Sequence, residues 1–289
     1  MFFFVNATVS KPQNVVKIKN GRAILNVKVY AKEKEETVIL LHGGPGIPDD
    51  MNEVMEILKK KFRVIAFDQR GAGYSTCKHC EYTMDNYISD IDAISDYFGL
   101  ESFHLFGHSW GGLYAQIYAS ENPQKIKSLF LCSPGSGTNS VWKQTEKEVM
   151  QFHKRITSKR DWIKMGWLSF MGMLGSNNAY YKLFKQVIMN YHRNYQIQYQ
   201  DLSLLKHVNS KAINKTRKEI IKYKSLEKKD NINYPVIITY GDNDIYGESR
   251  NDVINRYPEA QVITIRNSGH IPWKHNLNEF KKVLEDFYF

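Results

Sequence analysis

Hydrophobic and polar positions follow two alternating patterns along most of the chain. Short continuous apolar runs, typical of strands buried on both faces of a sheet, alternate with segments whose apolar residues lie three and four positions apart, as in helices with one buried face. The pattern predicts strands and helices in turn: a strand at 37–44, a helix at 49–61, a strand at 62–68, a helix at 85–100, a strand at 102–109, a helix at 110–122 and a strand at 126–134.

The chain before residue 37 reads as further strands. Segments 15–20 and 23–31 flank Asn20-Gly21, a dipeptide that favours a tight hairpin turn. The opening segment, 1–12, has no basic start and no small-residue cleavage site, so we interpret it as a first strand and not as a signal peptide.

The strand pattern stops at residue 135 and resumes after Pro235. The segment between holds only helical patterns, and residues 141–230 carry 19 Lys and Arg against 7 Asp and Glu, while the rest of the chain carries 21 against 23. Strands then alternate with helices again, at 236–244, 251–258, 260–270 and 276–289. We predict an α/β protein whose mostly parallel, doubly wound sheet (residues 1–134 and 232–289) is interrupted by a helical insertion, residues 135–231.

The composition is that of an ordinary globular protein, with 42% hydrophobic and 24% charged residues among 289. No apolar run approaches the ~18–20 residues that a membrane span needs. The three cysteines make no disulfide framework, and Cys77 and Cys80 form a lone C-x-x-C with no second pair for zinc. We interpret this pair as part of an incidental surface loop, with a labile thiol pair as the alternative. Free thiols and the absence of a leader favour a cytoplasmic location.

A serine lies between glycines where a predicted strand meets a predicted helix. Gly107 to Gly111 read GHSWG and fit G-x-S-x-G, the nucleophile elbow, whose tight turn presents the serine hydroxyl above the carboxyl edge of the sheet. Ser109 is therefore the candidate nucleophile.

A glycine-rich loop follows the strand at 37–44. Residues 42–46 read HGGPG, and such a loop lets backbone N–H groups approach an oxyanion without a Cβ in the way. We assign the two oxyanion donors to the amides of Gly44 and Trp110, with His42 and Gly43 as parts of the supporting loop.

A serine nucleophile needs a histidine base held by a carboxylate. His270 lies in a loop past the last predicted strand, where the order Ser…Asp…His expects the base. For the acid, both Asp242 and Asp244 follow the strand at 236–244. We prefer Asp244, which lies further past the strand end, and interpret Asp242 as a turn or supporting carboxylate. Packing, local geometry, a position in the basic insertion or the absence of a motif sets the other histidines aside: His42, His79, His104, His108, His153, His192, His207 and His275.

The segment 68–75, DQRGAGYS, follows another predicted strand. We interpret Arg70 as part of a buried, ion-paired turn that braces the neighbouring oxyanion loop, not as a catalytic group.

Together these motifs resemble the α/β-hydrolase fold and, more narrowly, the proline iminopeptidase group of serine peptidases. HGGPG, DQRGAGYS, GHSWGG, GDND and SGH stand in that family's order, over residues 15–134 and 232–289. The resemblance implies a Ser109–Asp244–His270 triad, an oxyanion hole at Gly44 and Trp110, no metal and no organic cofactor, and an insertion that forms a helical cap over the active site.

The insertion departs from that family. Relatives that release an N-terminal residue hold the substrate's ammonium with acidic side chains, commonly cap glutamates, yet here only Asp161 and Asp201 are acidic between Val149 and Lys218. A desolvated ammonium needs an anion, so the charge pattern argues against the activity that the resemblance implies.

Three hypotheses follow. The first is a serine hydrolase that cleaves a small N-terminal residue, typically proline, from short peptides or amides; the second is the same machinery acting on a small ester, lactone or simple amide. The third is a ligand-binding protein that keeps the fold without turnover. The basic insertion also admits an anionic membrane or nucleic acid as a partner, but a solvated helix face explains its dispersed lysines equally well, so we expect no nucleic acid.

The aromatic and methionine residues of the insertion suggest an apolar pocket above the serine. Its candidate lining residues are Trp142, Trp162 and Trp167, which alternatively join the insertion to the core.

Overall fold

The structure, a computed structural model, describes residues 10–49, 51–195, 197 and 202–289. The strand predicted at 1–12 therefore lies outside the described residues, except for residues 10–12, which form no strand.

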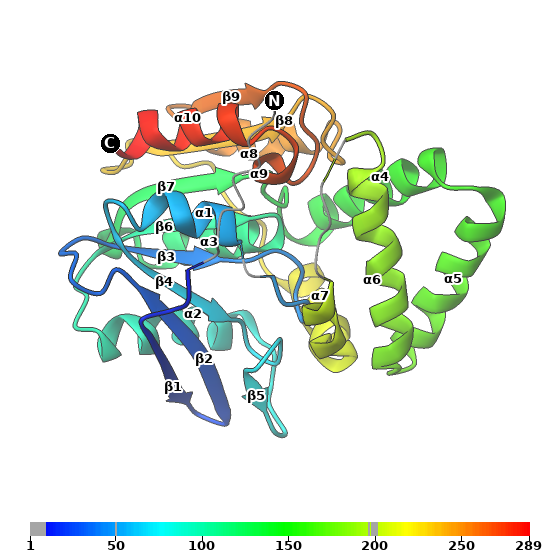
Figure 1. Ribbon diagram of the computed structural model, residues 1–289, viewed down its shortest axis with the longest axis horizontal. Coiled ribbons are helices and arrows are strands. Elements are labelled where there is room, and N and C mark those ends of the chain that lie inside the picture. The colour runs from blue at the N-terminus through cyan, green and yellow to red at the C-terminus, as the bar shows by residue number, and fades with distance from the viewer. Residues whose placement is uncertain (1–9, 50, 196, 198–201) are drawn as a thin grey trace, which may run out of the picture.

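In the part of the chain that the structure describes, nine strands form one sheet at the centre of the molecule (Figure 1). Its strands lie in the order β1-β2-β4-β3-β6-β7-β8-β9, with β5 paired to β2. Every pair from β4 across to β9 is parallel, and β2 is antiparallel to β1, β4 and β5. The strands are β1 (Asn14–Asn20), β2 (Ala23–Tyr30), β3 (Thr37–Leu41), β4 (Arg63–Asp68), β5 (Thr76–Cys77), β6 (Phe103–His108), β7 (Ile126–Cys132), β8 (Val236–Gly241) and β9 (Gln261–Ile265). The mostly parallel sheet that the sequence predicts is confirmed.

Helices cover both faces of this sheet, which explains the continuous apolar runs of its strands. In β3, Ile39 and Leu41 pack on the face covered by α2 and α3, whereas Val38 and Leu40 pack on the face covered by α1 and α10. The helices of this part are α1 (Asn52–Leu58), α2 (Met84–Tyr97), α3 (Trp110–Glu121), α8 (Arg250–Arg256), α9 (Pro272–His275) and α10 (Leu277–Tyr288), with a short 3-10 helix η1 (Pro123–Lys125).

The chain between β7 and β8 contains helices and, in its described residues, no strand. They are α4 (Asn139–Ile156), α5 (Lys159–Met173), α6 (Asn177–His192), α7 (Ser210–Lys222) and the 3-10 helix η2 (Ser203–His207). Figure 1 shows α4 to α7 to one side of the sheet, with α5 outermost. Across the described residues, no helix has both the length and the apolar character that crossing a bilayer requires.

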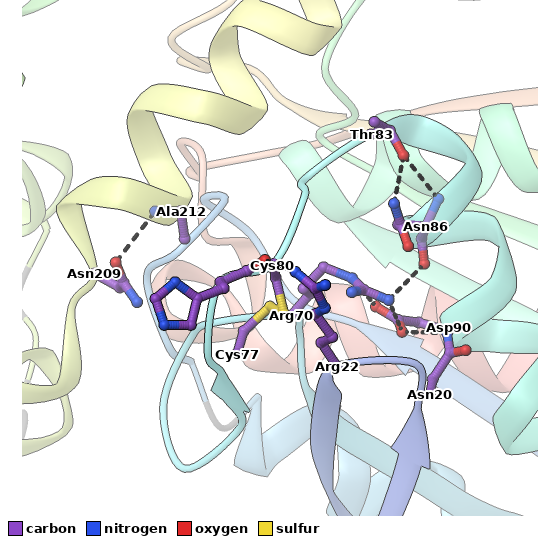
Figure 2. The surroundings of a disulfide bond; sticks show 11 residues. Asn20, Arg22, Arg70, Cys77, Cys80, Thr83, Asn86, Asp90, Asn209 and Ala212 are labelled. Atoms are coloured by element: carbon purple, nitrogen blue, oxygen red, sulfur yellow. Dashed lines mark hydrogen bonds and ion pairs between the residues drawn. A yellow bond between two sulfur atoms is a disulfide. The ribbon is translucent and has the colours of Figure 1, made fainter.

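Cys77 and Cys80 form a disulfide (Figure 2). The expectation that this pair lies free in an incidental loop was therefore wrong: the loop brings the two Cα atoms to 5.4 Å, within the span of a disulfide, which spacing alone does not reveal. Cys132 keeps a free, buried thiol. The expected cytoplasmic location loses its support from free thiols, because disulfides persist mainly in oxidising compartments.

Arg70 forms the buried, ion-paired turn expected of it. Its guanidinium donates to both carboxylate oxygens of Asp90 on α2, at 2.6 and 3.0 Å, and to the carbonyl oxygen of Asn86 (Figure 2). The arginine is 2% exposed, and these three hydrogen bonds offset part of the cost of burying both charges. This ion pair fixes the loop after β4 against α2.

Candidate active site

Ser109 lies in the turn between β6 and α3, with φ 56° and ψ −120°. Non-glycine residues rarely adopt a positive φ, so the turn holds this serine in a strained conformation. A Cβ at Gly107 would lie 2.3 Å from the carbonyl oxygen of Gly111, and a Cβ at Gly111 would lie 2.1 Å from that of Leu41. Both glycines are therefore required for the turn to close.

Three side chains from separate strand ends meet at this turn. The Oγ atom of Ser109 lies 3.0 Å from Nε2 of His270, and Nδ1 of His270 lies 3.0 Å from Oδ1 of Asp244. The histidine side chain is 3% exposed and the carboxylate is fully buried. In the arrangement that satisfies every group, the serine donates to Nε2 and Nδ1–H donates to the carboxylate.

Asp242 does not face the histidine base. Its carboxylate accepts hydrogen bonds from the backbone amides of Asn267 and Ser268, at 2.8 and 3.0 Å. It therefore ties the loop after β8 to the loop that leads to His270. Of the two carboxylates that the sequence left open, Asp244 is the one that contacts the imidazole.

The environment of Asp244 favours its ionised form. Burial alone would raise the pKa of this carboxyl, but the neighbouring His270 and the hydrogen bonds from His270, Ser133 and the amide of Tyr246 outweigh burial, and the pKa lies below its usual value. The hydroxyl of Ser133 donates to Oδ2 at 2.6 Å. Ser133 could not be found from the sequence, because its role depends on β7 lying beside β8.

Tyr246 brings a fourth side chain to the serine. Its hydroxyl lies 3.3 Å from Oγ of Ser109, and its ring meets the His270 ring edge-on, with centroids 5.0 Å apart. Burial raises the pKa of this phenol, so it is protonated and able to donate. Because the serine proton is directed at His270, the phenol is the donor to Oγ. Tyr246 belongs to no motif, and sequence reasoning missed it.

The HGGPG loop packs directly against the nucleophile. A Cβ built at Gly43 would lie 3.3 Å from Cβ of Ser109, and Gly44 has a positive φ of 57°. Trp110 is the first residue of α3, so its N–H is among the helix-terminal amides that have no partner within the helix. The two predicted oxyanion donors thus lie on the two segments that meet at Ser109.

Gln69 connects these two segments. Its backbone amide donates to Nε2 of His42 at 3.1 Å, and its side chain donates to the carbonyl oxygen of His42 at 2.7 Å. The same side chain accepts from the indole N–H of Trp110 at 2.7 Å. His42 therefore contacts Gln69 through both its ring and its backbone, and Gln69 was missed because its partners are remote in sequence.

His108 is a structural histidine. Its Nε2 lies 2.8 Å from the carbonyl oxygen of His270, so this nitrogen carries the proton and donates. Burial, and then the nearby His270, lower the pKa of His108 to about 3. This neutral ring holds the backbone of His270 in place through the hydrogen bond to its carbonyl oxygen.

His275 supports the same loop from α9, although no motif surrounds it. Its Nδ1 accepts from the amide of Gly269 at 2.9 Å, and its Nε2 lies 3.0 Å from Nδ1 of His192 at the end of α6. Tyr195 stacks on its ring at 3.8 Å. Burial, and then His192, lower the pKa of His275 to about 3. The insertion and the loop of the histidine base are thus joined by a contact between two histidines.

A cavity of about 490 Å³ opens between the ends of α4 and α6 and the loops after β8 and β9. His270 and Asp244 line it, together with Tyr191, Arg155 and Asp242, whereas Ser109 is not among its lining residues. The cavity therefore reaches the catalytic candidates from the histidine side and carries one cationic and one further anionic side chain.

None of the three candidate tryptophans lines this cavity. Trp142 packs against the main hydrophobic core, near Gly135, which fits the alternative role of joining the insertion to the core. Trp162 and Trp167 lie on α5, and Trp167 is 62% exposed. The structure therefore does not support a pocket role for Trp167.

Comparison with known proteins gives a consistent picture. A family model described as alpha/beta hydrolase fold matches residues 36–273. Proline iminopeptidases of Lactobacillus helveticus (strain DPC 4571) and Clostridioides difficile (strain 630) are each 34% identical, over 43% and 44% of this chain. Each match spans 44% of the relative's length, less than half of it.

Solved structures resemble almost the whole chain at low identity. A proline iminopeptidase of Mycobacterium smegmatis has a TM-score of 0.64 at 17% identity, covering 95% of this chain and 97% of its own. Carboxylesterase CesB of Bacillus subtilis has a TM-score of 0.63 at 15% identity, covering 95% and 90%. At such identities the likeness shows the fold alone.

The neutral buried histidines predict how stability depends on pH. Burial lowers the pKa values of His108 and His275 to about 3 and that of His153 to about 4. In the unfolded chain each titrates near 6.5, so below pH 6.5 the unfolded state binds protons that the folded state does not. We expect the free energy of unfolding to fall between pH 6.5 and 4.5, by up to about 1.4 kcal/mol per pH unit for each histidine.

Urea denaturation at several pH values measures this slope. His153→Gln serves as the matched variant, because the new amide can still pair with Asn190, which lies 3.0 Å from the histidine ring. The variant should lose one histidine's share of the slope, since all other titrating groups are common to both proteins. Identical slopes would contradict the neutral state assigned to His153.

Proposed function

Because the chain belongs to the alpha/beta hydrolase fold family, we propose that it is a serine hydrolase that works through an acyl-enzyme on Ser109. One observation carries this proposal: Ser109, His270 and Asp244 are joined by two hydrogen bonds of 3.0 Å each. This is the geometry that lets an imidazole remove a serine proton while a carboxylate holds its tautomer.

The reaction proceeds in two halves. As Oγ of Ser109 attacks the substrate carbonyl carbon, Nε2 of His270 takes its proton, and the ionised Asp244 stabilises the imidazolium. The oxyanion is assigned to the N–H groups of Gly44 and Trp110. When the tetrahedral intermediate collapses, the imidazolium of His270 gives its proton to the leaving group, and an ester remains on Ser109. Water, deprotonated by His270, then attacks that ester and releases the acid.

Tyr246 adds a donor to the reacting oxygen. Negative charge develops on Oγ when the serine loses its proton and again when the acyl-enzyme breaks down. A protonated phenol 3.3 Å away stabilises that charge in both steps. We therefore propose that Tyr246 is a catalytic residue beside Ser109, His270 and Asp244.

For the substrate, we propose a small peptide or amino-acid amide whose N-terminal residue is released, as in a proline iminopeptidase. The relatives of that name support this choice, over the part of the chain that they match. Asp242 is the anionic side chain of the cavity that is not engaged with His270, and it offers a counter-charge for a free ammonium.

A specific observation favours a second candidate, a small ester or lactone that bears an acid group. Arg155 lines the same cavity, and the insertion (residues 135–231) carries the basic excess of the chain. The guanidinium of Arg155 attracts a substrate carboxylate and repels a substrate ammonium.

We further propose that the insertion acts as a cap on the active site. Glu148 of α4 accepts hydrogen bonds from the amides of Gly247 and Ser249, at 2.8 and 3.0 Å. Glu148 therefore binds the loop that directly follows Asp244 and Tyr246. Glu148 does not line the cavity beside His270, so it is not placed to hold a substrate ammonium there.

The two substrate classes are separated by hydrolysis of proline and alanine anilides with free and blocked amines, beside short acyl esters. We expect the free-amine anilides to exceed the blocked ones in kcat/KM by about 10-fold or more, the value of one modest charge interaction. Ser109→Ala should lower every activity by about 10³-fold or more.

The outcomes are distinct. Turnover of blocked anilides and esters without turnover of free-amine substrates would replace the first candidate with the second. Retained activity in Ser109→Ala would contradict the serine mechanism as a whole.

The role of Tyr246 is tested by Tyr246→Phe, which removes the hydroxyl and keeps the ring. We expect kcat/KM to fall about 5- to 10-fold, the value of one hydrogen bond to a reacting oxygen. Tyr240→Phe is the matched control, because it also removes a buried hydroxyl, one that has no hydrogen-bond partner in the described structure. Equal rates in the two variants would remove Tyr246 from the mechanism.

A further inference from the structure

The outer face of α5 carries an exposed apolar stripe. Ile163, Trp167, Phe170 and Leu174 follow one another at spacings of four, three and four, which places them on one side of the helix. They are 72%, 62%, 47% and 67% exposed, and the rings of Trp167 and Phe170 lie 5.9 Å apart. Met173, 57% exposed, lies beside them. We name these five residues the α5 stripe.

The α5 stripe is not the face by which the helix packs. Met165 is buried in a cluster with Tyr180, and a Cβ at Gly172 would lie 2.2 Å from the same tyrosine ring. These positions lie on the opposite side of the helix, toward α6. Figure 1 shows α5 at the outer edge of the molecule, with α6 between it and the sheet. Within the described residues, the stripe is thus left open to solvent.

Basic side chains accompany the stripe. Lys159, Arg160 and Lys164 belong to the same helix and are exposed. The one acidic residue of α5, Asp161, accepts a hydrogen bond from Ser158 at the start of the helix. Residues 141–230 as a whole carry 19 basic against 7 acidic side chains.

An exposed apolar patch of this kind marks a surface that binds another protein or a membrane. A second copy of this chain would bring the same positive insertion against itself, so like charges would oppose the contact. A nucleic acid would pair with the lysines and leave Ile163 and Leu174 in water. An anionic lipid surface matches both features, because headgroup phosphates meet the basic side chains while the apolar side chains enter the boundary below them.

We propose that α5 docks the protein on an anionic lipid surface, with the α5 stripe inserted and Lys159, Arg160 and Lys164 at the headgroups. The helix lies in the plane of the interface, which needs no membrane-spanning segment. Trp167 suits this position, since its ring is apolar and its indole N–H remains able to reach the headgroups.

Co-sedimentation with lipid vesicles tests this docking. The full chain should bind vesicles of phosphatidylcholine that contain phosphatidylglycerol, and bind pure phosphatidylcholine vesicles at least about 10-fold more weakly. Binding to the anionic vesicles should fall sharply as salt is raised towards 1 M, where the Debye length shrinks to about 3 Å.

Two variants of α5 examine the two features separately. Trp167→Ser with Phe170→Ser should lower the partition coefficient by about 10-fold or more, through loss of inserted apolar area. Lys159→Gln with Arg160→Gln and Lys164→Gln should lower it by a similar factor on anionic vesicles alone. The matched control is Tyr97→Ser with Val262→Ser, which removes two exposed apolar residues elsewhere, 57% and 43% exposed, and should bind as the wild type does.

Vesicle binding is measured without any assay of activity, so its outcome is independent of whether the proposed reaction is correct. Circular dichroism melts show that each variant is folded. Equal binding of the α5 variants and the control, or no binding by the wild type, would overturn the proposal. A wild-type dimer in lipid-free solution that Trp167→Ser with Phe170→Ser dissociates would assign the stripe to a second copy instead.

Discussion

A line of hydrogen bonds from Asp244 through His270 to Ser109 is the interaction on which the rest of this structure depends. It requires side chains from three loops to meet, with His270 3.0 Å from Ser109 on one side of its ring and 3.0 Å from Asp244 on the other. The backbone accepts a strained serine to achieve this, and two glycines allow the strand, the helix and β3 to approach closely enough. The parallel sheet supplies the frame, because the loops at the carboxyl ends of its strands all open on the same edge.

Much of the molecule around this line serves to hold it still. His108 and His275 fix the loop of the histidine base, while Asp242 joins that loop to the one after β8. Both histidines are buried and neutral, so they act as directional hydrogen-bonding groups and add no positive charge beside the base. Positive charge is instead concentrated in the insertion, where it is exposed.

Most of the fold could be predicted from the sequence, since continuous apolar runs and helical spacing report burial directly. Ser109, His42 and His270 could be found as well, because each lies in a short motif at a strand end. Tyr246, Gln69 and Ser133 could not, because their roles arise from contacts between segments far apart in the chain. The disulfide between Cys77 and Cys80 was missed for a related reason: the spacing C-x-x-C is compatible with free and bonded thiols, and only the loop geometry distinguishes them.

Covalent trapping of the nucleophile tests the central claim most directly. The folded protein is incubated with a fluorophosphonate, and the adduct is located by intact mass and peptide mapping. We expect one label per chain, on Ser109, formed at a rate that His270→Ala lowers by orders of magnitude while the variant remains folded. A label on another residue, or a rate that is indifferent to His270, would contradict it.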